Sequence, residues 1–126
     1  MPVWTALSIV APHGLNIARG RKTLEVRSWQ PDQWPLNDLL IVENDRYLSA
    51  DLPSDDQGRA VALVDVVAVR PWEPTDVQAA LSACWQPGYW AWELSNVRPL
   101  DPTPHVQARL GLYTLSLSLP ISASGS

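Results

Sequence analysis

The stretch LSIVAPHGLNIARGRKTLEVRSW, residues 7–29, contains the patterns that decide the start of the fold. Residues 5–10 are aliphatic and β-branched, which predicts a short buried strand before Pro12. Proline suits the first turn of a helix and Gly20 suits its left-handed end, so a short helix is expected between them. Residues 23–29 alternate between two faces, as in a half-buried strand. This one stretch therefore predicts strand, helix and strand in succession.

Most of the remaining chain predicts short strands separated by proline-rich or acidic loops. Apolar or alternating residues indicate the strands, whereas Pro74 followed by spaced apolar residues indicates a short helix. Because the strands do not alternate regularly with helices, the pattern argues against a parallel sheet. We expect a mainly β (α+β) fold, a small β-barrel of about five to six strands with two or more short flanking helices. The expected strands are 38–44, 59–70, 89–94 and 110–119, the helix is 74–83, and the loops are 30–37 and 51–58.

The composition indicates one domain with a substantial core. The chain has 126 residues, of which 46% are hydrophobic and 17% charged, and this excludes a disordered chain. We expect a single domain over residues 1–119 and a flexible tail over residues 120–126, where the residues are mostly small and polar. The lack of a long apolar run or a basic leader, together with a single cysteine, predicts a cytoplasmic protein without membrane contact. That cysteine, Cys84, is most simply a small buried apolar residue.

Basic residues gather in one place on an otherwise acidic chain. The net charge is −4, yet four cations lie close together with only Glu25 between them: Arg19, Arg21, Lys22 and Arg27. This balance disfavours binding along a long nucleic acid, because such binding grows with the number of phosphates neutralised, and it favours a small ligand. Two histidines and one cysteine, far apart in sequence, give no metal-ligand spacing. We therefore expect neither a metal nor a cofactor.

The segment GRKTLEVR, residues 20–27, is the strongest candidate for chemistry. Glu25 and Arg27 lie two positions apart on a strand, so their side chains face the same way and can pair or jointly grip a planar polar ligand. Neighbouring cations and any burial would lower the pKa of Lys22, the chain's only lysine, and suit it to act as a general base or to hold an oxyanion. The alternative is a solvated turn with a weak surface ion pair.

Gly20, Lys22, Glu25 and Arg27 reproduce the G-x-K-x-x-E-x-R signature of the ASCH domain, the activating-signal-cointegrator homology domain. The segment YWAWELSNVRPL resembles that family's late aromatic strand, and RLGLYTL resembles its closing strand. The resemblance covers residues 5–117. It implies a PUA-like β-barrel with a cleft beside the signature, since the ASCH domain is a relative of the PUA RNA-binding fold.

The resemblance also implies an activity. Members of the family are similar to RNA-binding modules, and some are hydrolases that remove the acyl group of N4-acetylcytidine or act as ribonucleases. In the amidohydrolases a lysine works with a threonine and a glutamate; the lysine falls on Lys22, whereas Glu25 stands at the threonine position. Thr23 is the nearest hydroxyl, and Glu73 is the nearest counterpart of the glutamate. Hydrolysis by water stays chemically possible, with catalytic Glu25 as the base and catalytic Lys22 stabilising the oxyanion.

Further residues are candidates for substrate binding together with Arg27 of the signature. Trp29 and Trp92 could stack on a base or belong to the core. Asn44 could read a base edge or cap a turn, and His13 could exchange protons near neutral pH or simply lie on the surface. Glu93 could face the cleft from the aromatic strand, together with Tyr89.

Three functions are open at this point. The first is a hydrolase acting on RNA or a modified nucleoside, such as an N4-acylcytidine amidohydrolase or a ribonuclease. The second is a non-catalytic reader that binds RNA or a nucleotide without turnover. The third is a regulatory adaptor that contacts a protein partner through residues 30–37. The family resemblance favours the first two.

Overall fold

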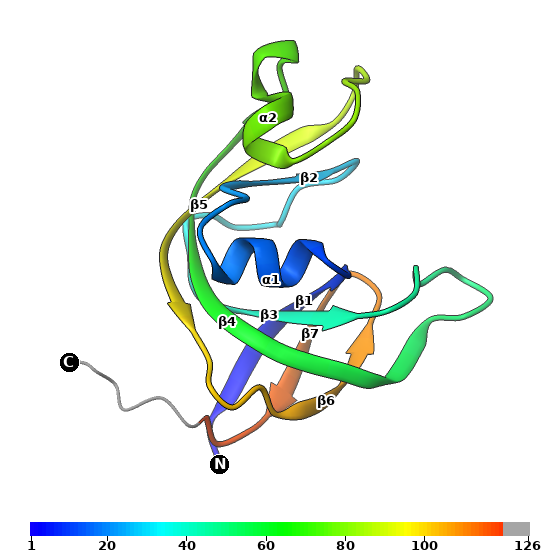
Figure 1. Ribbon diagram of the computed structural model, residues 1–126, viewed down its shortest axis with the longest axis vertical. Helices are drawn as coiled ribbons and strands as arrows, with labels where there is room; N and C mark the ends of the chain where they lie inside the picture. Colours follow the sequence, from blue (N-terminus) through cyan, green and yellow to red (C-terminus); the bar gives the residue numbers. More distant parts are fainter. Residues whose placement is uncertain (120–126) are drawn as a thin grey trace.

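The computed structural model describes residues 1–119, whose strands form one strongly curved sheet (Figure 1). The tail predicted for residues 120–126 lies outside the described residues. A 3-10 turn at Pro74–Asp76 leads into α2. The strands are β1 (Val3–Val10), β2 (Leu24–Arg27), β3 (Leu36–Asn44), β4 (Ser54–Pro71), β5 (Trp90–Pro99), β6 (His105–Arg109) and β7 (Leu112–Ser116), and the helices are α1 (His13–Ala18) and α2 (Val77–Ala80).

The sheet is open and mixed. Its strand order is β2-β5-β4-β3-β1-β7, with β6 paired to β4 beside this path. The prediction of a mainly β chain is confirmed, but the prediction of a closed barrel with five to six strands is wrong, because the seven strands leave β2 and β7 at opposite ends. The sheet is mixed and mainly antiparallel, in line with the argument against a parallel sheet, although β1 and β3 pair in parallel. The connection between them contains α1 and β2 and is long enough to return the chain to the same end of the sheet.

Strand β4 is the longest strand of the sheet and pairs with three others. It has 18 residues and pairs with β6 through its first part, with β5 through the rest, and with β3 on its other side. It begins at Ser54, so part of the predicted loop 51–58 is strand. Gly58 permits the close approach of β6, because a Cβ there would lie 2.6 Å from the Val106 carbonyl oxygen. The short strand β6 was not predicted.

Helix α1 is held in place by a residue of the sheet. No side chain of α1 caps its beginning, but Glu43 of β3 accepts a hydrogen bond from the Leu15 amide (2.8 Å). The Glu43 carboxylate is buried and is also bound by Arg59 at 3.0 Å. Gly14 fits against it, because a Cβ at this position would lie 2.8 Å from the Glu43 Cβ. This contact sets the position of α1 and of the turn that follows it.

The elements leave an opening on one side of the molecule. In Figure 1 the sheet curves around α1, with α2 and β2 towards the top and the β3–β4 loop projecting below them at the right. The predicted helix 74–83 is shorter than expected: α2 ends at Ala80, and Leu81 takes a left-handed conformation with φ 52°. The chain then continues as segment 81–89, which leads to β5. Residues 30–37 precede and enter β3, and Trp34 among them is exposed.

Candidate functional site

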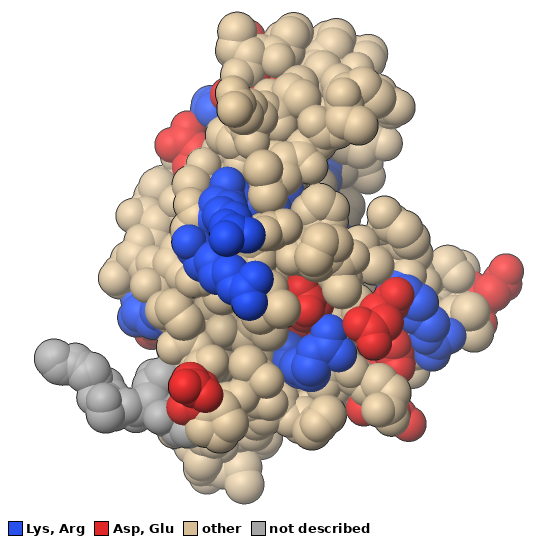
Figure 2. Space-filling view, in the orientation of Figure 1, with Lys and Arg blue, Asp and Glu red and all other residues tan. Residues whose placement is uncertain are grey.

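A cavity of about 660 Å³ lies on this open side. Its wall is built from the ends of β1 and β3, the signature residues between Lys22 and Arg27, the β3–β4 loop, segment 80–89 and the β6–β7 turn. Figure 2 shows the corresponding notch between the upper end of the molecule and the lower arm. The volume is in the range of small-ligand sites.

Lys22 lies in the wall of this cavity with only 5% of its surface exposed. Its ammonium group donates to the carbonyl oxygen of Ala80 and lies 3.5 Å from Glu25 Oε1. Burial lowers the pKa of Lys22; nearby Arg27 lowers it further, and Glu25 opposes both effects. The expected lowering therefore comes mainly from burial, whereas the neighbours Arg19 and Arg21 are exposed and not among its causes.

Glu25 joins the lysine to the guanidinium of the motif. Its Oε2 accepts a hydrogen bond from Arg27 Nε at 2.7 Å, and Arg27 Nη2 donates to the Ser8 carbonyl at 2.9 Å. The predicted pairing on one strand face is confirmed. The alternative of a solvated turn is wrong, because Lys22 and Glu25 are both buried. Two cations share one carboxylate here, so the cluster keeps a positive charge.

His13 lines the same cavity at the start of α1. Its Nδ1 is buried and has no hydrogen-bond partner among residues 1–119. Burial lowers the pKa of His13, and the charge of Lys22 lowers it further. The imidazole is consequently neutral at neutral pH and can accept or donate one hydrogen bond to a ligand.

Of the two roles predicted for Asn44, reading a base edge or capping a turn, its contacts within the protein correspond to the turn-capping role. Its side chain is almost completely buried and donates to the Arg46 carbonyl and, at 3.4 Å, to Asp55 Oδ2. Its own carbonyl accepts the amide of Ala11 at 2.8 Å. Asn44 therefore lines the cavity and fixes the first residues of the β3–β4 loop.

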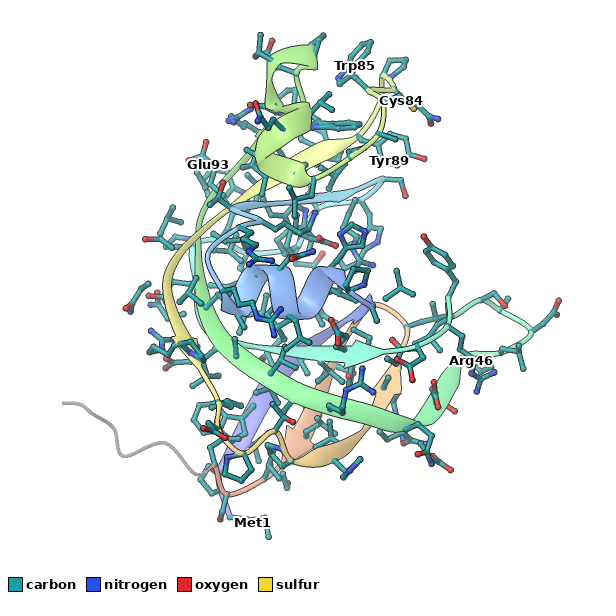
Figure 3. The ribbon with its side chains drawn as sticks, viewed as in Figure 1. Met1, Arg46, Cys84, Trp85, Tyr89 and Glu93 are labelled. Carbon is teal, nitrogen blue, oxygen red and sulfur yellow. The ribbon has the colours of Figure 1, made fainter. Side chains whose placement is uncertain are left out.

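Three predicted binding residues do not line the cavity. Trp92 is 0% exposed and belongs to the main core cluster with Ile17, so the structure contradicts its stacking on a base. Trp29 packs edge-on against it with ring centroids 5.1 Å apart. Glu93 pairs with Arg70 at 2.7 Å, and Figure 3 places it at the outer margin of the sheet, away from the opening. The alternation of residues along β5 assigns Trp92 and Glu93 to opposite faces of the strand, but it does not indicate which face borders the cavity.

The cavity wall also contains residues that the sequence analysis missed. Arg46 and Tyr47 come from the β3–β4 loop, and Arg109 comes from the end of β6. Tyr89, which was expected to face the cleft together with Glu93, lines the cavity from the segment before β5. Figure 3 shows Tyr89 on the upper side of the opening and Arg46 on the lower arm. No periodic pattern in the sequence marks Arg46, Tyr47 or Arg109 as cavity residues. Cys84, expected to be buried, is exposed and belongs to the wall as well.

These features define a class: a small β-rich domain whose sheet curves around one helix and carries a lysine–carboxylate–arginine motif at a basic cavity. The sequence profile of the ASCH domain matches residues 7–104, and the chain therefore belongs to the ASCH domain family. No curated protein matches the chain significantly. Within residues 1–119, no helix is long and apolar enough to cross a membrane, and no group of three or more His, Cys, Asp or Glu is arranged to hold a metal ion.

The fold is similar to that of solved ASCH structures. The crystal structure of ASCH from Zymomonas mobilis has a TM-score of 0.56 and 13% identity, with 85% of this chain and 87% of that chain covered. A mutant of the same Zymomonas mobilis protein has a TM-score of 0.52 and 13% identity, with 85% and 89% covered. At this identity the likeness establishes the shared fold.

Proposed function

We propose that the cavity binds a nucleoside, free or at an RNA end, and hydrolyses an acyl amide on its base, as in N4-acylcytidine. The observation that carries this proposal is the buried Lys22 ammonium, 3.5 Å from the Glu25 carboxylate in the wall of a nucleoside-sized cavity. Membership of the ASCH family supports a nucleic-acid-derived ligand, and the motif residues are those that the family resemblance connects with hydrolysis.

The chemistry needs a base and an oxyanion donor. An ammonium group has three N–H donors; Ala80 and Glu25 occupy two in Lys22, which leaves one for the acyl oxygen of a substrate. A water molecule attacks the acyl carbon, Glu25 accepts the water proton, and Lys22 stabilises the negative charge on the acyl oxygen. The carbon–nitrogen bond then breaks, and Glu25 returns the proton to the exocyclic nitrogen. The products are the carboxylic acid and the free amino base.

A second candidate is a reader that binds without turnover. The observation that favours it is that the charged groups of the motif already have partners within the protein. Each Glu25 oxygen faces a cation, and Lys22 also donates to a backbone carbonyl. In addition, the position at which the amidohydrolases of the resemblance have a threonine carries Glu25. This reader would bind the same ligands, and Arg27→Ala would weaken that binding in a salt-sensitive way without any product being formed.

The deciding experiment compares purified wild-type protein, Lys22→Ala and the control Arg21→Ala on N4-acetylcytidine and on a structured RNA. We expect wild type and Arg21→Ala to release cytidine and Lys22→Ala to lose the activity. Arg21 is exposed and does not line the cavity, so its removal controls for net charge. Cleavage of the RNA in place of deacylation would favour the ribonuclease. Equal behaviour of wild type and Lys22→Ala on both substrates would refute the proposal.

A further inference from the structure

The corner of the cavity formed by the β3–β4 loop and the end of β6 carries positive charge that the proposed hydrolysis does not use. Resting on the proposed function, we infer that Arg46 and Arg109 form a subsite for a terminal phosphate. The ligand class of the site is then a nucleoside monophosphate, with its base towards Lys22 and its phosphate monoester on the two guanidinium groups.

The pairing of β4 with β6 brings these two arginines together. Arg109 is the cross-strand partner of Ser54, and Arg46 Nη2 donates to the Ser54 carbonyl at 3.0 Å. Both arginines line the cavity. The β3–β4 loop and the end of β6 therefore present two planar groups of donors at the same corner, an arrangement that suits the oxygens of a phosphate.

The two arginines differ in how far their charge is compensated. Arg46 lies 3.3 Å from Asp55 Oδ2, so part of its charge is already balanced. Arg109 donates through Nε to the neutral amide oxygen of Gln107 at 2.9 Å and has no acidic partner among residues 1–119. Its terminal nitrogens are available to an anion. Arg109 is accordingly the principal residue of the subsite, and Arg46 is the secondary one.

Ser8 connects this corner to the motif. Its carbonyl accepts from Arg27 Nη2 at 2.9 Å, and its hydroxyl accepts the Arg109 amide at 3.1 Å. One β1 residue thus joins the Lys22–Glu25–Arg27 cluster to the end of β6. The proposed base-binding and phosphate-binding regions are neighbouring parts of one cavity, as a single nucleotide requires.

Aromatic side chains on the rim suit the remainder of such a ligand. Tyr47 of the β3–β4 loop is 79% exposed although it lines the cavity, and Tyr89 lines the cavity on the upper side of the opening (Figure 3). Exposed aromatic faces of this kind stack on bases of any sequence. The cavity therefore offers stacking surface and a charged corner, which together distinguish a nucleotide from an uncharged nucleoside.

Calorimetric titration of wild-type protein with cytidine, cytidine 5′-monophosphate and cytidine 3′-monophosphate tests this inference, and the two monophosphates show which phosphate position is used. We expect at least one monophosphate to bind roughly tenfold more tightly than cytidine, because charge-assisted hydrogen bonds are added. Arg109→Gln should remove most of this preference and Arg46→Gln a smaller part. Arg21→Gln removes the same charge outside the cavity and should retain the preference.

The outcomes separate the two proposals. Equal affinity of wild type for cytidine and both monophosphates would overturn the phosphate subsite and leave the proposed function standing. The same would follow if Arg109→Gln kept the preference as fully as Arg21→Gln does. Failure of wild type to bind any of the three ligands would overturn both proposals.

Discussion

Two ion clusters lie near each other where β2, β5 and β4 pair, and they are built in opposite ways. In the first, Lys22 and Arg27 share the single carboxylate of Glu25. In the second, the single cation Arg70 is held by Asp76 at 2.6 Å and by Glu93 at 2.7 Å. The Lys22 and Glu25 side chains are almost fully buried, whereas those of Arg70 and Glu93 are 36% and 38% exposed.

This difference indicates that the Lys22 cluster belongs to a binding site, whereas the Arg70 cluster is purely structural. The Arg70 cluster satisfies its cation completely, which raises the Arg70 pKa, and it links β4 and β5 to the turn before α2. The Lys22 cluster has more cation than carboxylate, excludes most water, and borders a cavity. An uncompensated, partly desolvated cation attracts an anionic or polar ligand, whereas a neutralised pair in solvent does not.

Removal of the carboxylate from each cluster is expected to give the largest contrast. Glu25→Ala leaves the buried Lys22 beside the half-buried Arg27 without a counter-ion, which should lower the free energy of unfolding by about 3–5 kcal/mol. Glu93→Ala removes one of two acids from an exposed cation and should cost about 0–1 kcal/mol. Urea denaturation of both variants provides the measurement. Equal losses would mean that burial does not distinguish the clusters.

Displacement of α1 should disturb only the first cluster. In Gly14→Ala the new Cβ would lie 2.8 Å from the Glu43 Cβ, and such overpacking costs about 1–3 kcal/mol. The shift is transmitted to His13 and to the turn before Lys22, which contacts Asn16 through its amide. NMR spectra of Gly14→Ala should therefore show shifts around the Lys22 cluster but not around Arg70. Shifts of similar size at both would contradict separate anchoring.

The lowered pKa of Lys22 gives a pH signature that the Arg70 cluster lacks. Between this lowered pKa and the ordinary value of 10.5, the unfolded chain binds more protons at Lys22 than the folded chain does. The stability of wild type relative to Lys22→Met should consequently rise with pH through this interval. Paired urea denaturations from neutral to alkaline pH measure it. A difference that stays constant or falls would show that the pKa is not lowered.

The same titration sets the alkaline limit of the proposed hydrolysis. Lys22 must be an ammonium ion to stabilise the oxyanion, so kcat/KM should fall as pH rises through its lowered pKa, below 10.5. In Lys22→Arg the guanidinium stays charged, and any residual activity should continue to higher pH. An alkaline limit that is the same in wild type and Lys22→Arg would assign the titration to another group.

The sequence predicted the local part of this site and missed the part made by distant segments. The shared face of Glu25 and Arg27 follows from the two-residue period of a strand, which holds even in a strand as short as β2. The burial of Lys22 depends on Ala80, 58 positions away, and no local pattern encodes that contact. Arg46 and Arg109 likewise reach the same corner of the cavity, on either side of Ser54, because β4 pairs with β6.

The fold was predictable to a similar extent. The strand at 59–70 and the one at 38–44 were clear from their apolar runs, whereas β6 has only five residues and alternates weakly. A closed barrel and an open curved sheet give the same local alternation, because closure depends on whether the end strands meet. For the same reason Trp92 and Glu93 were misplaced: alternation on β5 assigns neighbours to opposite faces without telling what covers each face.

Arg70→Gln is expected to change stability only slightly, and the pH dependence of this change tests the interpretation of the second cluster as purely structural. At neutral pH the variant should lose about 0.2–1 kcal/mol of stability, as exposed ion pairs do. Hydrogen bonds from Arg70 lower the pKa of Asp76 below 3.8, so the stabilisation is present above that value and is lost as pH falls through the lowered pKa. Urea denaturation of wild type and Arg70→Gln should therefore differ at pH 7 and converge in strong acid. A difference that persists in acid would mean that Arg70 stabilises the fold through packing of its side chain, and the contrast between the two clusters would no longer be one of charge.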